Sequence, residues 1–228
     1  SATLPNADEA AEAVVGSPHG NGSTAPRPRI VRGEMARPVI IDAVLPRDPR
    51  KLPWAGHLGL SMLLEVADSL NPAEPTLLFT NTRSQAERWF NALLIVRPEW
   101  TEIAALHHGS LDRDERERVE AGLKDGSIRI VVATSSLDLG VDFGPVERVF
   151  QIGSPKGVAR LIQRAGRSAH RPRATARITC VPAHALEMLE ITAARDALAR
   201  GDIEPRTPPP KPLDVLVQHL VTCALGGG

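Results

Sequence analysis

Hydrophobic positions follow two different periods along the middle of the chain. Short apolar runs, typical of buried strands, alternate with stretches whose apolar residues recur at helical spacing. The runs that predict strands are 76–79, 102–106, 128–133, 147–152 and 176–181, and 39–41 indicates a further short strand. Strands that alternate with helices in this way are typical of βαβ units. The pattern therefore predicts an α/β fold with an open parallel sheet and helices on both faces.

Capping residues indicate where the predicted helices begin. The expected helices cover 57–70, a segment from 82 onward, 112–126, a segment from 154 onward, and 183–199. Thr82 is the predicted N-cap of the second of these, with Gln85 reaching back to complete a capping box. Ser154 is the predicted N-cap of the fourth, because Pro155 follows it and proline suits the first helical position.

The two flanks of this region have a different character. Residues 1–37 are rich in Gly, Pro and Ser and are predicted to be irregular. A proline-rich linker follows at 207–212, and 213–225 is a predicted helix. That helix is too short to form a domain, so we expect it to be the first helix of a longer segment.

Composition bounds the class of protein. The 228 residues are 42% hydrophobic and 24% charged, as expected for one α/β domain with flanking pieces. No run of about 18 apolar residues is present, so no membrane span is expected. The first residues lack the basic and apolar segments of a signal peptide. The chain also begins without Met, which indicates a fragment.

The cysteines and histidines predict neither a disulfide nor a metal site. Cys180 and Cys223 lie far apart without CxxC spacing, which favours reduced thiols and a cytoplasmic location. No His/Cys cluster has the spacing of metal ligands.

The distribution of charge is more informative than its sum. Lys+Arg and Asp+Glu both total 27, which gives zero net charge. However, no Asp or Glu occurs between Arg148 and Leu186, a stretch that holds eight basic residues: Arg148, Lys156, Arg160, Arg164, Arg167, Arg171, Arg173 and Arg177. This local field suits the phosphates of a nucleotide or a nucleic acid. A scattered, solvated basic surface is the alternative.

Two loops that follow predicted strands carry donors suited to phosphate. Asn81, Thr82 and Arg83 open a helix, where backbone amides bind anions and a neighbouring arginine adds a directed donor. Alternatively, Asn81 and Thr82 only cap that helix. The second loop, 107–110, combines a glycine that permits close backbone approach with the Ser110 hydroxyl.

Two further loops carry the sharpest chemistry. In 133–143, the hydroxyls of Thr134 and Ser135 follow a buried strand, and Asp142 suits a sugar hydroxyl. A polar turn with a capping aspartate is the alternative. In 163–170, Gln163 and Arg167 lie four residues apart on one helix face. An arginine delivered across a domain boundary stabilises charge on a transferring phosphoryl group, whereas the alternative is a solvated helix end.

Taken in order, these loops resemble the motifs of superfamily 2 helicases. The segments that carry the resemblance are 77–83 (motif IV), 108–110 (the following motif), 133–142 (motif V), 163–167 (motif VI) and, at the start, Ser1, Ala2 and Thr3 (motif III). The stretches 53–59, 81–87 and 212–219 are similar to those of the large helicase-related (Lhr-type) proteins, including the ligase-associated DEXH-box DNA helicases. The resemblance covers nearly the whole chain.

The resemblance implies the second RecA-like domain of an ATP-dependent 3′-to-5′ DNA helicase that acts in DNA repair. The partners it implies are single-stranded DNA or a DNA/RNA hybrid, ATP with Mg²⁺, and the first RecA-like domain of the same full-length chain. It divides this chain into the end of that first domain and a linker (1–37), the second domain (38–206), and a linker with the first helix of a winged-helix domain (207–228).

Matched motif by motif, the resemblance also implies roles for individual residues. The expected catalytic residues are Arg167 as arginine finger, Gln163 and His170, which stands where many relatives have a second arginine. Those expected beside the nucleotide are Gly140, Asp142 and Arg164. Those expected to bind nucleic acid are Asn81, Thr82, Arg83, His108, Gly109, Ser110, Thr134 and Ser135. Ala169 departs from the glycine expected there, which leaves the position of His170 open.

Two motifs of a complete motor do not occur in this sequence. There is neither a GxxxxGK[ST] phosphate loop nor an acidic DEXH box. We therefore expect no ATP hydrolysis by this chain alone. The alternatives are a RecA-like module that binds nucleic acid without ATP chemistry, and an α/β domain of flavodoxin or methyltransferase type.

Overall fold

The computed structural model describes residues 5–15, 29–31, 38–56, 58–138, 144, 146–168, 175–205 and 212–226. The chain divides into two units, of which the larger covers residues 34–204 together with 1–3, and the smaller covers 4–33 and 205–228.

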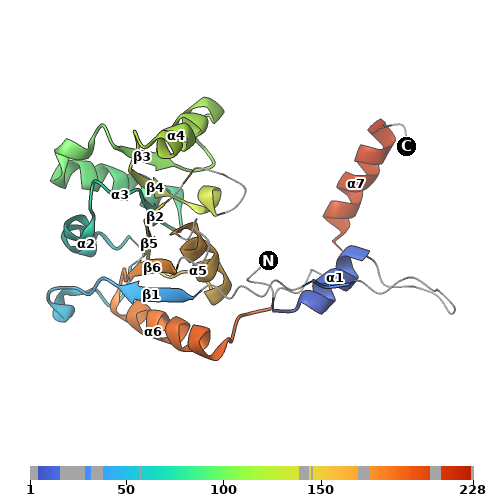
Figure 1. Ribbon diagram of the computed structural model, residues 1–228, viewed down its shortest axis with the longest axis horizontal. Helices are drawn as coiled ribbons and strands as arrows, with labels where there is room; N and C mark the ends of the chain where they lie inside the picture. The colour runs from blue at the N-terminus through green and yellow to red at the C-terminus, as the bar shows by residue number, and fades with distance from the viewer. Residues whose placement is uncertain are drawn as a thin grey trace. The chain divides into compact units, whose positions relative to one another are not determined.

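The larger unit is built on one parallel sheet (Figure 1). Its strands are β1 (Val39–Ala43), β2 (Thr76–Phe79), β3 (Ala104–His107), β4 (Ile130–Ala133), β5 (Arg148–Ile152) and β6 (Ala176–Val181). They are ordered β1-β6-β5-β2-β4-β3, and every pairing is parallel. The predicted open parallel sheet is confirmed, and the short run at 39–41 is the beginning of edge strand β1.

Burial explains why the central strands have no polar alternation. Every residue of β2 and β4 is buried, because strands in the middle of a parallel sheet are covered on both faces. Edge strand β3 instead alternates between partly buried and buried residues. The continuous apolar runs of the sequence therefore belong to the centre of the sheet.

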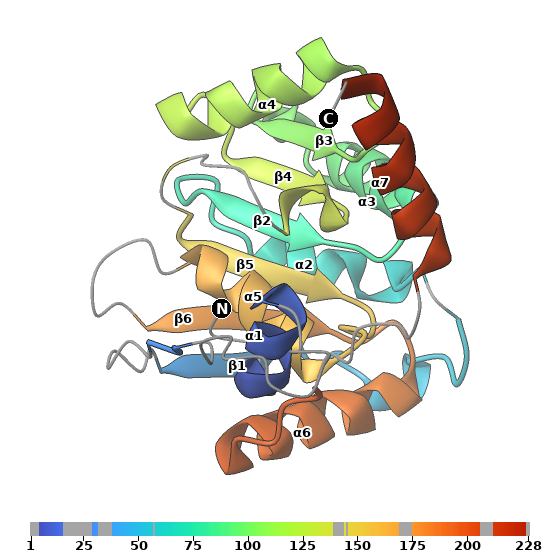
Figure 2. The same cartoon turned by 90° about the vertical axis from the view of Figure 1, so that its right-hand side faces the viewer.

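Helices cover both faces, as predicted. On one face lie α2 (Leu63–Ser69) and α3 (Arg83–Val96), packed against side chains such as Leu78 and Val132. On the other lie α4 (Arg113–Asp125), α5 (Val158–Ala165) and α6 (Ala185–Arg200), packed against Leu77, Phe79 and Val131. Figure 2 looks onto this second face, with α4, α5 and α6 placed in order across the sheet.

Within the described residues, short 3-10 helices join these elements: η1 (Pro49–Lys51), η2 (Leu60–Met62), η3 (Pro98–Trp100), η4 (Ser135–Leu137) and η5 (Gly166–Ser168). The helix predicted over 57–70 begins later, at η2, and continues as α2. Gly59 precedes it with a φ of 70° and packs against Ala183 and Ile152. That left-handed conformation, which glycine adopts without steric cost, sets the first helical residue at Leu60.

The predicted helix start at Ser154 is wrong. The helix α5 begins at Val158, and its N-cap is Gly157, with a φ of 124°. The backbone N–H of Ser154 donates to the Glu187 carboxylate over 2.8 Å, and its carbonyl accepts from Asn81 over 2.8 Å. These two contacts hold Ser154 in a loop outside the helix, and Pro155 is not its first residue.

The smaller unit contains two described helices. The helix α1 (Ala7–Val15) contradicts the prediction that residues 1–37 are irregular throughout. Alanine and glutamate dominate its sequence and have high helix propensity, which the glycines and prolines further along obscured. The predicted helix at 213–225 is confirmed as α7 (Leu213–Gly226). Among the described residues, no helix is both long and apolar enough to cross a membrane.

Candidate functional site

A buried polar contact of the larger unit joins α5 to the loop after β4. The Arg164 side chain is only 1% exposed. Its Nε lies 2.8 Å from Asp138 Oδ1 and its Nη2 lies 3.3 Å from Asp138 Oδ2. Its Nη1 donates to Gln151 Oε1, and its guanidinium lies over the Phe79 ring, 4.5 Å from the centroid. We call Asp138, Gln151, Phe79 and Arg164 the Asp138 cluster.

Charge pairing makes this buried arrangement tolerable. Burial lowers the pKa of Arg164, and the hydrogen bond and charge of Asp138 act in the opposite direction. An unpaired guanidinium at this depth would be strongly destabilising, because a buried charge needs a partner and hydrogen bonds. The donors of Arg164 are directed at acceptors of its own domain, so the geometry gives Arg164 a clear structural role.

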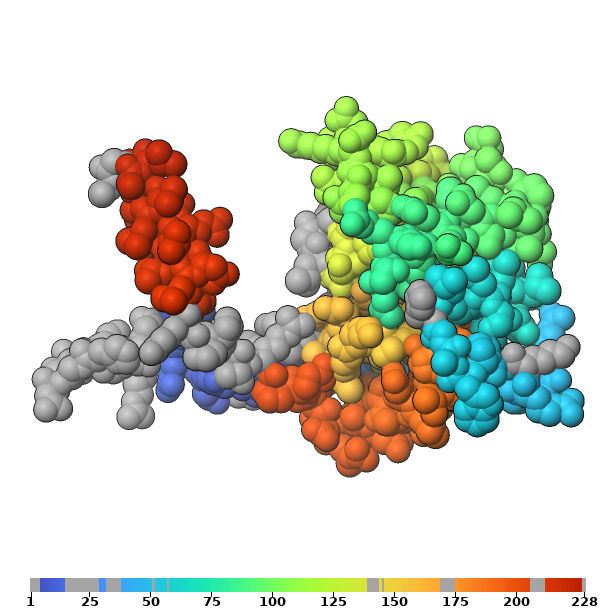
Figure 3. Space-filling model, turned by 180° about the vertical axis from the view of Figure 1, so that it is seen from behind, coloured from blue at the N-terminus to red at the C-terminus, as the bar shows by residue number. Residues whose placement is uncertain are grey.

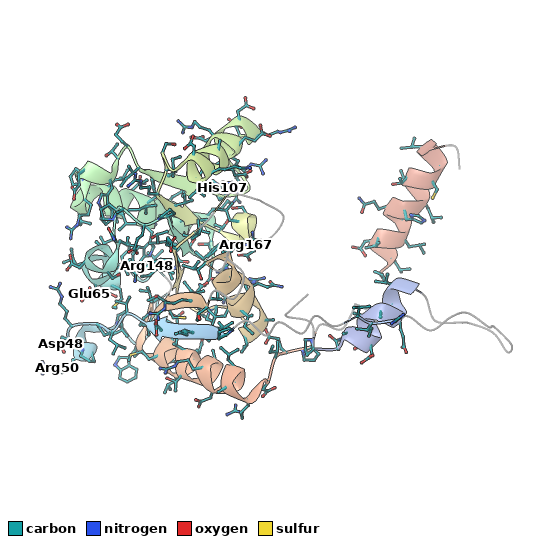
Figure 4. All side chains as sticks on the ribbon, viewed as in Figure 1. Asp48, Arg50, Glu65, His107, Arg148 and Arg167 are labelled. Carbon is teal, nitrogen blue, oxygen red and sulfur yellow. The ribbon has the colours of Figure 1, made fainter. Side chains whose placement is uncertain are left out.

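Arg167 lies beside the same aspartate, one turn further along the chain. It is partly buried in η5, and its Nη2 donates to the backbone carbonyl of Asp138 over 2.6 Å. Burial lowers its pKa, opposed by the charge of Asp138. Figure 4 shows Arg167 beyond α5, on the face of the sheet that α5 covers. The structure thus brings Arg167 to the loop that follows β4, and Gln163 is partly buried on α5 beside Arg164.

Several predicted site residues lie outside the described residues. They are His170, Gly140, Asp142, Ser1, Ala2 and Thr3. Their roles remain predictions.

The turn after β2 is organised by its own side chains. Thr82 is the N-cap of α3 and accepts from the backbone N–H of Gln85 over 3.1 Å. The Gln85 side chain reaches back one residue further than expected, and its Oε1 accepts from the N–H of Asn81 over 2.9 Å. The cap at Thr82 is confirmed, but the reciprocal bond of the capping box goes to Asn81.

The turns after β2 and β3 contact each other. The Arg83 guanidinium donates to the Ser110 hydroxyl, and both residues are exposed. The backbone N–H of Ser110 donates to His108 Nδ1 over 3.3 Å, and His108 Nε2 lies 3.4 Å from Glu87. An exposed arginine, hydroxyl and glycine thus meet beside the N-terminus of α3, where an anion is favoured.

The turn after β4 is held by a histidine that the sequence analysis did not select. His107, at the end of β3, is 1% exposed. Its carbonyl accepts from the Thr134 N–H over 3.2 Å and from the Ser136 hydroxyl over 3.1 Å. Its ring bridges Ser136, at 2.7 Å from Nδ1, and Glu120 on α4, at 3.2 Å from Nε2. Burial is the main cause that lowers its pKa.

Glu204 is a further contact that sequence patterns did not reveal. Its carboxylate accepts from the first amides of α5, those of Val158 over 3.2 Å and Ala159 over 3.0 Å. Gly157 offers no side chain to cap these amides, and a Cβ at that position would collide with Glu204 Oε1. The glycine and the distant glutamate therefore replace the usual local N-cap.

Among the described residues, no group of His, Cys, Asp or Glu is arranged to hold a metal ion. The Asp138 cluster and the turns after β2, β3 and β4 offer hydrogen-bond donors instead. Arg167 lies beside the loop after β4, and the exposed turns after β2, β3 and β4 carry Arg83, Ser110 and Ser135.

The model of the family described as "Helicase conserved C-terminal domain" matches residues 59–172. The chain belongs to this family. A second model, "Large helicase-related protein, winged helix domain", matches residues 196–228 and so begins within α6.

The similar proteins are also helicases of the Lhr type. The chain is 32% identical over 99% of its length to the ATP-dependent helicase Lhr-Core of Sulfolobus acidocaldarius, covering 25% of that protein. It is 42% identical over 66% of its length to an ATP-dependent helicase Lhr-Core of Methanocaldococcus jannaschii, covering 18% of it. The chain therefore spans a quarter or less of these relatives. The resemblance to Lhr-type helicases is confirmed.

Solved structures give the same result for the fold. The chain is similar to the Mycobacterium smegmatis helicase Lhr bound to ssDNA and AMP-PNP, with a TM-score of 0.69, 32% identity, and coverage of 81% of this chain and 24% of that one. It also resembles the DUF1998 helicase MrfA bound to DNA and AMPPNP, with a TM-score of 0.69 at 22% identity over 96% of this chain and 30% of that one, which supports the fold alone. The fold of this helicase C-terminal domain is RecA-like, as expected.

Proposed function

We propose that this chain supplies the second motor domain of an ATP-dependent 3′-to-5′ DNA helicase or translocase that acts in DNA repair. The observation that carries the proposal is the contact of Arg167 with the backbone of Asp138. The Asp138 cluster fixes α5 against the loop after β4, so the arginine just beyond α5 has a defined position. The similar Lhr of M. smegmatis, solved with ssDNA and AMP-PNP, supports both ligand classes.

Arg167 is the proposed arginine finger. An arginine finger stabilises the charge that develops on a transferring phosphoryl group and contributes about 10³ to 10⁵ in rate in GTPases. The sequence stretch 148–186 contains no acidic residue, and the nearby Asp138 carboxylate is paired with Arg164. Gln163 and His170 are the other proposed catalytic residues. Gly140 and Asp142 are proposed to lie beside the bound nucleotide. Arg164 was expected beside the nucleotide, but its donors already bond to Asp138 and Gln151, so its proposed role is to hold the loop that positions Arg167.

ATP with Mg²⁺ would supply the energy, held mainly by a first RecA-like domain of the full-length protein. This chain contains neither a phosphate loop nor a DEXH box. By itself it is therefore expected to show no ATP turnover above background. In the proposed division, residues 1–37 end that first domain, 38–206 form the second, and 207–228 begin a winged-helix domain, which the second family match supports.

The exposed turns at the carboxyl ends of β2, β3 and β4 are the proposed track for single-stranded DNA or one strand of a DNA/RNA hybrid. The residues proposed for this track are Asn81, Thr82, Arg83, His108, Gly109, Ser110, Thr134 and Ser135. Of these, the His108 and Thr134 side chains are buried, at 5% and 8% exposed, and the others reach the surface at least in part. The support is the Arg83–Ser110 contact beside the N-terminus of α3, since phosphates bind to helix N-termini and to arginine.

The test of the finger is Arg167→Ala in the complete protein. We expect the turnover number for ATP to fall by about 10³-fold or more, while affinity for single-stranded DNA changes little, because the arginine stabilises charge only during phosphoryl transfer. Arg113→Ala is the matched control, since Arg113 is an exposed residue of α4 paired with Glu117. Unchanged turnover in Arg167→Ala would remove the finger from the proposal.

A further inference from the structure

Trp54 is an exposed aromatic residue in a protein with few of them. The sequence contains only three tryptophans. Trp89 and Trp100 are 0% and 4% exposed, whereas Trp54 is 77% exposed. Ala55 and Gly56, which follow it, are themselves exposed and carry too little side chain to cover an indole. A large apolar ring is thus presented to solvent outside the core.

The loop that carries Trp54 is anchored on both sides. The Pro53 carbonyl accepts from the Ala185 N–H over 2.8 Å. The Leu58 carbonyl accepts from Trp89 Nε1 over 2.5 Å and from Gln85 Nε2 over 3.3 Å. An aromatic side chain on an anchored loop loses little conformational freedom when it binds a ligand, which favours binding.

The anchors place this loop at the carboxyl ends of the strands. Ala185 is the first residue of α6, directly after β6. Gln85 also bonds the backbone of Asn81, the first residue of the turn after β2. Figure 3 shows the cyan segment around residues 50–65 side by side with α3 and with the orange α6. Through Gln85, the Trp54 loop is therefore linked to the turn proposed to hold phosphates.

We propose that Trp54 is a stacking platform for a base of single-stranded nucleic acid. This inference rests on the proposed function, which places the phosphates of that strand at Asn81, Thr82 and Arg83. Bases extend away from a bound backbone, and every base has a π-face, so an exposed indole binds bases with little regard to sequence. Base stacking by Trp54 would add binding energy that the phosphate contacts cannot provide.

The first test measures binding of the complete protein to a fluorescent oligothymidylate by anisotropy. Alanine substitution of a stacking aromatic weakens binding by roughly 5- to 150-fold. We expect a loss in this range for Trp54→Ala and most of the affinity back in Trp54→Phe, which retains an aromatic face. The dependence of affinity on salt should stay the same, because no phosphate contact is removed. Ile95→Ala, at a 78% exposed position on α3, is the control and should bind normally.

A second measurement separates stacking from a structural effect. One abasic nucleotide is moved stepwise along the oligonucleotide. If Trp54 stacks on a base, the abasic site should weaken the wild type at one position and leave Trp54→Ala unaffected there. The proposal would be overturned if the losses of affinity from the abasic nucleotide and from Trp54→Ala added to each other at every position of the abasic site. So would a Trp54→Ala protein that melts earlier but binds with unchanged affinity, the result expected if another part of the complete protein covers the ring.

The outcomes distinguish this inference from the proposed function. Tight binding that is equal in wild type and Trp54→Ala removes the stacking role and leaves the motor role intact. Unchanged turnover in Arg167→Ala removes the finger and leaves stacking intact. A wild-type protein that binds no single strand overturns both.

Discussion

Arg164 and Arg83 were both predicted to bind ligands because they lie in helicase-like motifs, yet one is buried and the other is exposed. Arg164 is 1% exposed and bonds to Asp138 and Gln151. Arg83 is exposed and bonds to the hydroxyl of Ser110. A buried guanidinium is costly unless paired, whereas an exposed one exchanges its hydroxyl partner for a phosphate at little cost. Arginines in helicase motifs can therefore hold the fold or hold the ligand, and burial distinguishes the two.

Asp138→Ala tests the buried side of this comparison and should have the largest effect. Removing one partner of a buried ion pair costs about 3–5 kcal/mol, because the other charge stays buried without its counter-ion. We expect the free energy of unfolding in urea to fall by about that amount. Asp196→Ala, at an exposed position on α6, should unfold like the wild type.

The double variant Asp138→Leu, Arg164→Met makes the argument sharper. Replacing both members of a buried pair with apolar residues often restores stability. The double variant should therefore lose less free energy of unfolding than the sum of the losses in Asp138→Leu and Arg164→Met. Simple additivity would mean that the two side chains are not energetically coupled.

Thr82→Ala tests a contact of intermediate size. The hydroxyl caps α3 by accepting from the Gln85 N–H, and loss of such a cap costs about 1 kcal/mol. We expect the urea midpoint to fall, and Thr82→Ser to restore it because serine supplies the same acceptor. Equal midpoints for all three proteins would show that the cap does not contribute.

His107 predicts a dependence of stability on pH. Burial lowers the pKa of the folded histidine below its usual value near 6.5. The unfolded chain therefore binds a proton first as the pH falls. Stability from this group is complete above about pH 6.5 and declines as the pH falls from there through the lowered pKa. In His107→Gln, the free energy of unfolding should depend less on pH in that window. An unchanged dependence would mean that other groups cause it.

Arg83→Ala tests the exposed side and should have the smallest effect on folding, within about 0.5 kcal/mol. Its effect should appear in binding. Loss of one phosphate contact weakens affinity evenly across sequences and lowers the salt slope by about one. A large loss of stability in Arg83→Ala would show that Arg83, like Arg164, holds the fold.

Sequence patterns predicted the strands better than the contacts between them. The apolar runs at 76–79 and 176–181 coincide with β2 and β6, because a strand buried on both faces leaves a local signal. The pairing of Asp138 with Arg164 leaves no such signal, since the two residues meet only when α5 packs on the sheet. The start of α5 was misplaced for the same reason, because Asn81 and Glu187 hold Ser154 from distant elements.

The carboxylate of Glu204 ties the segment after α6 to the beginning of α5. Two hydrogen bonds to the amides of Val158 and Ala159 form this link. A displacement of Glu204 itself must either move the first turn of α5 or break both bonds. The position of the chain just after α6 is thus coupled to the helix that precedes Arg167.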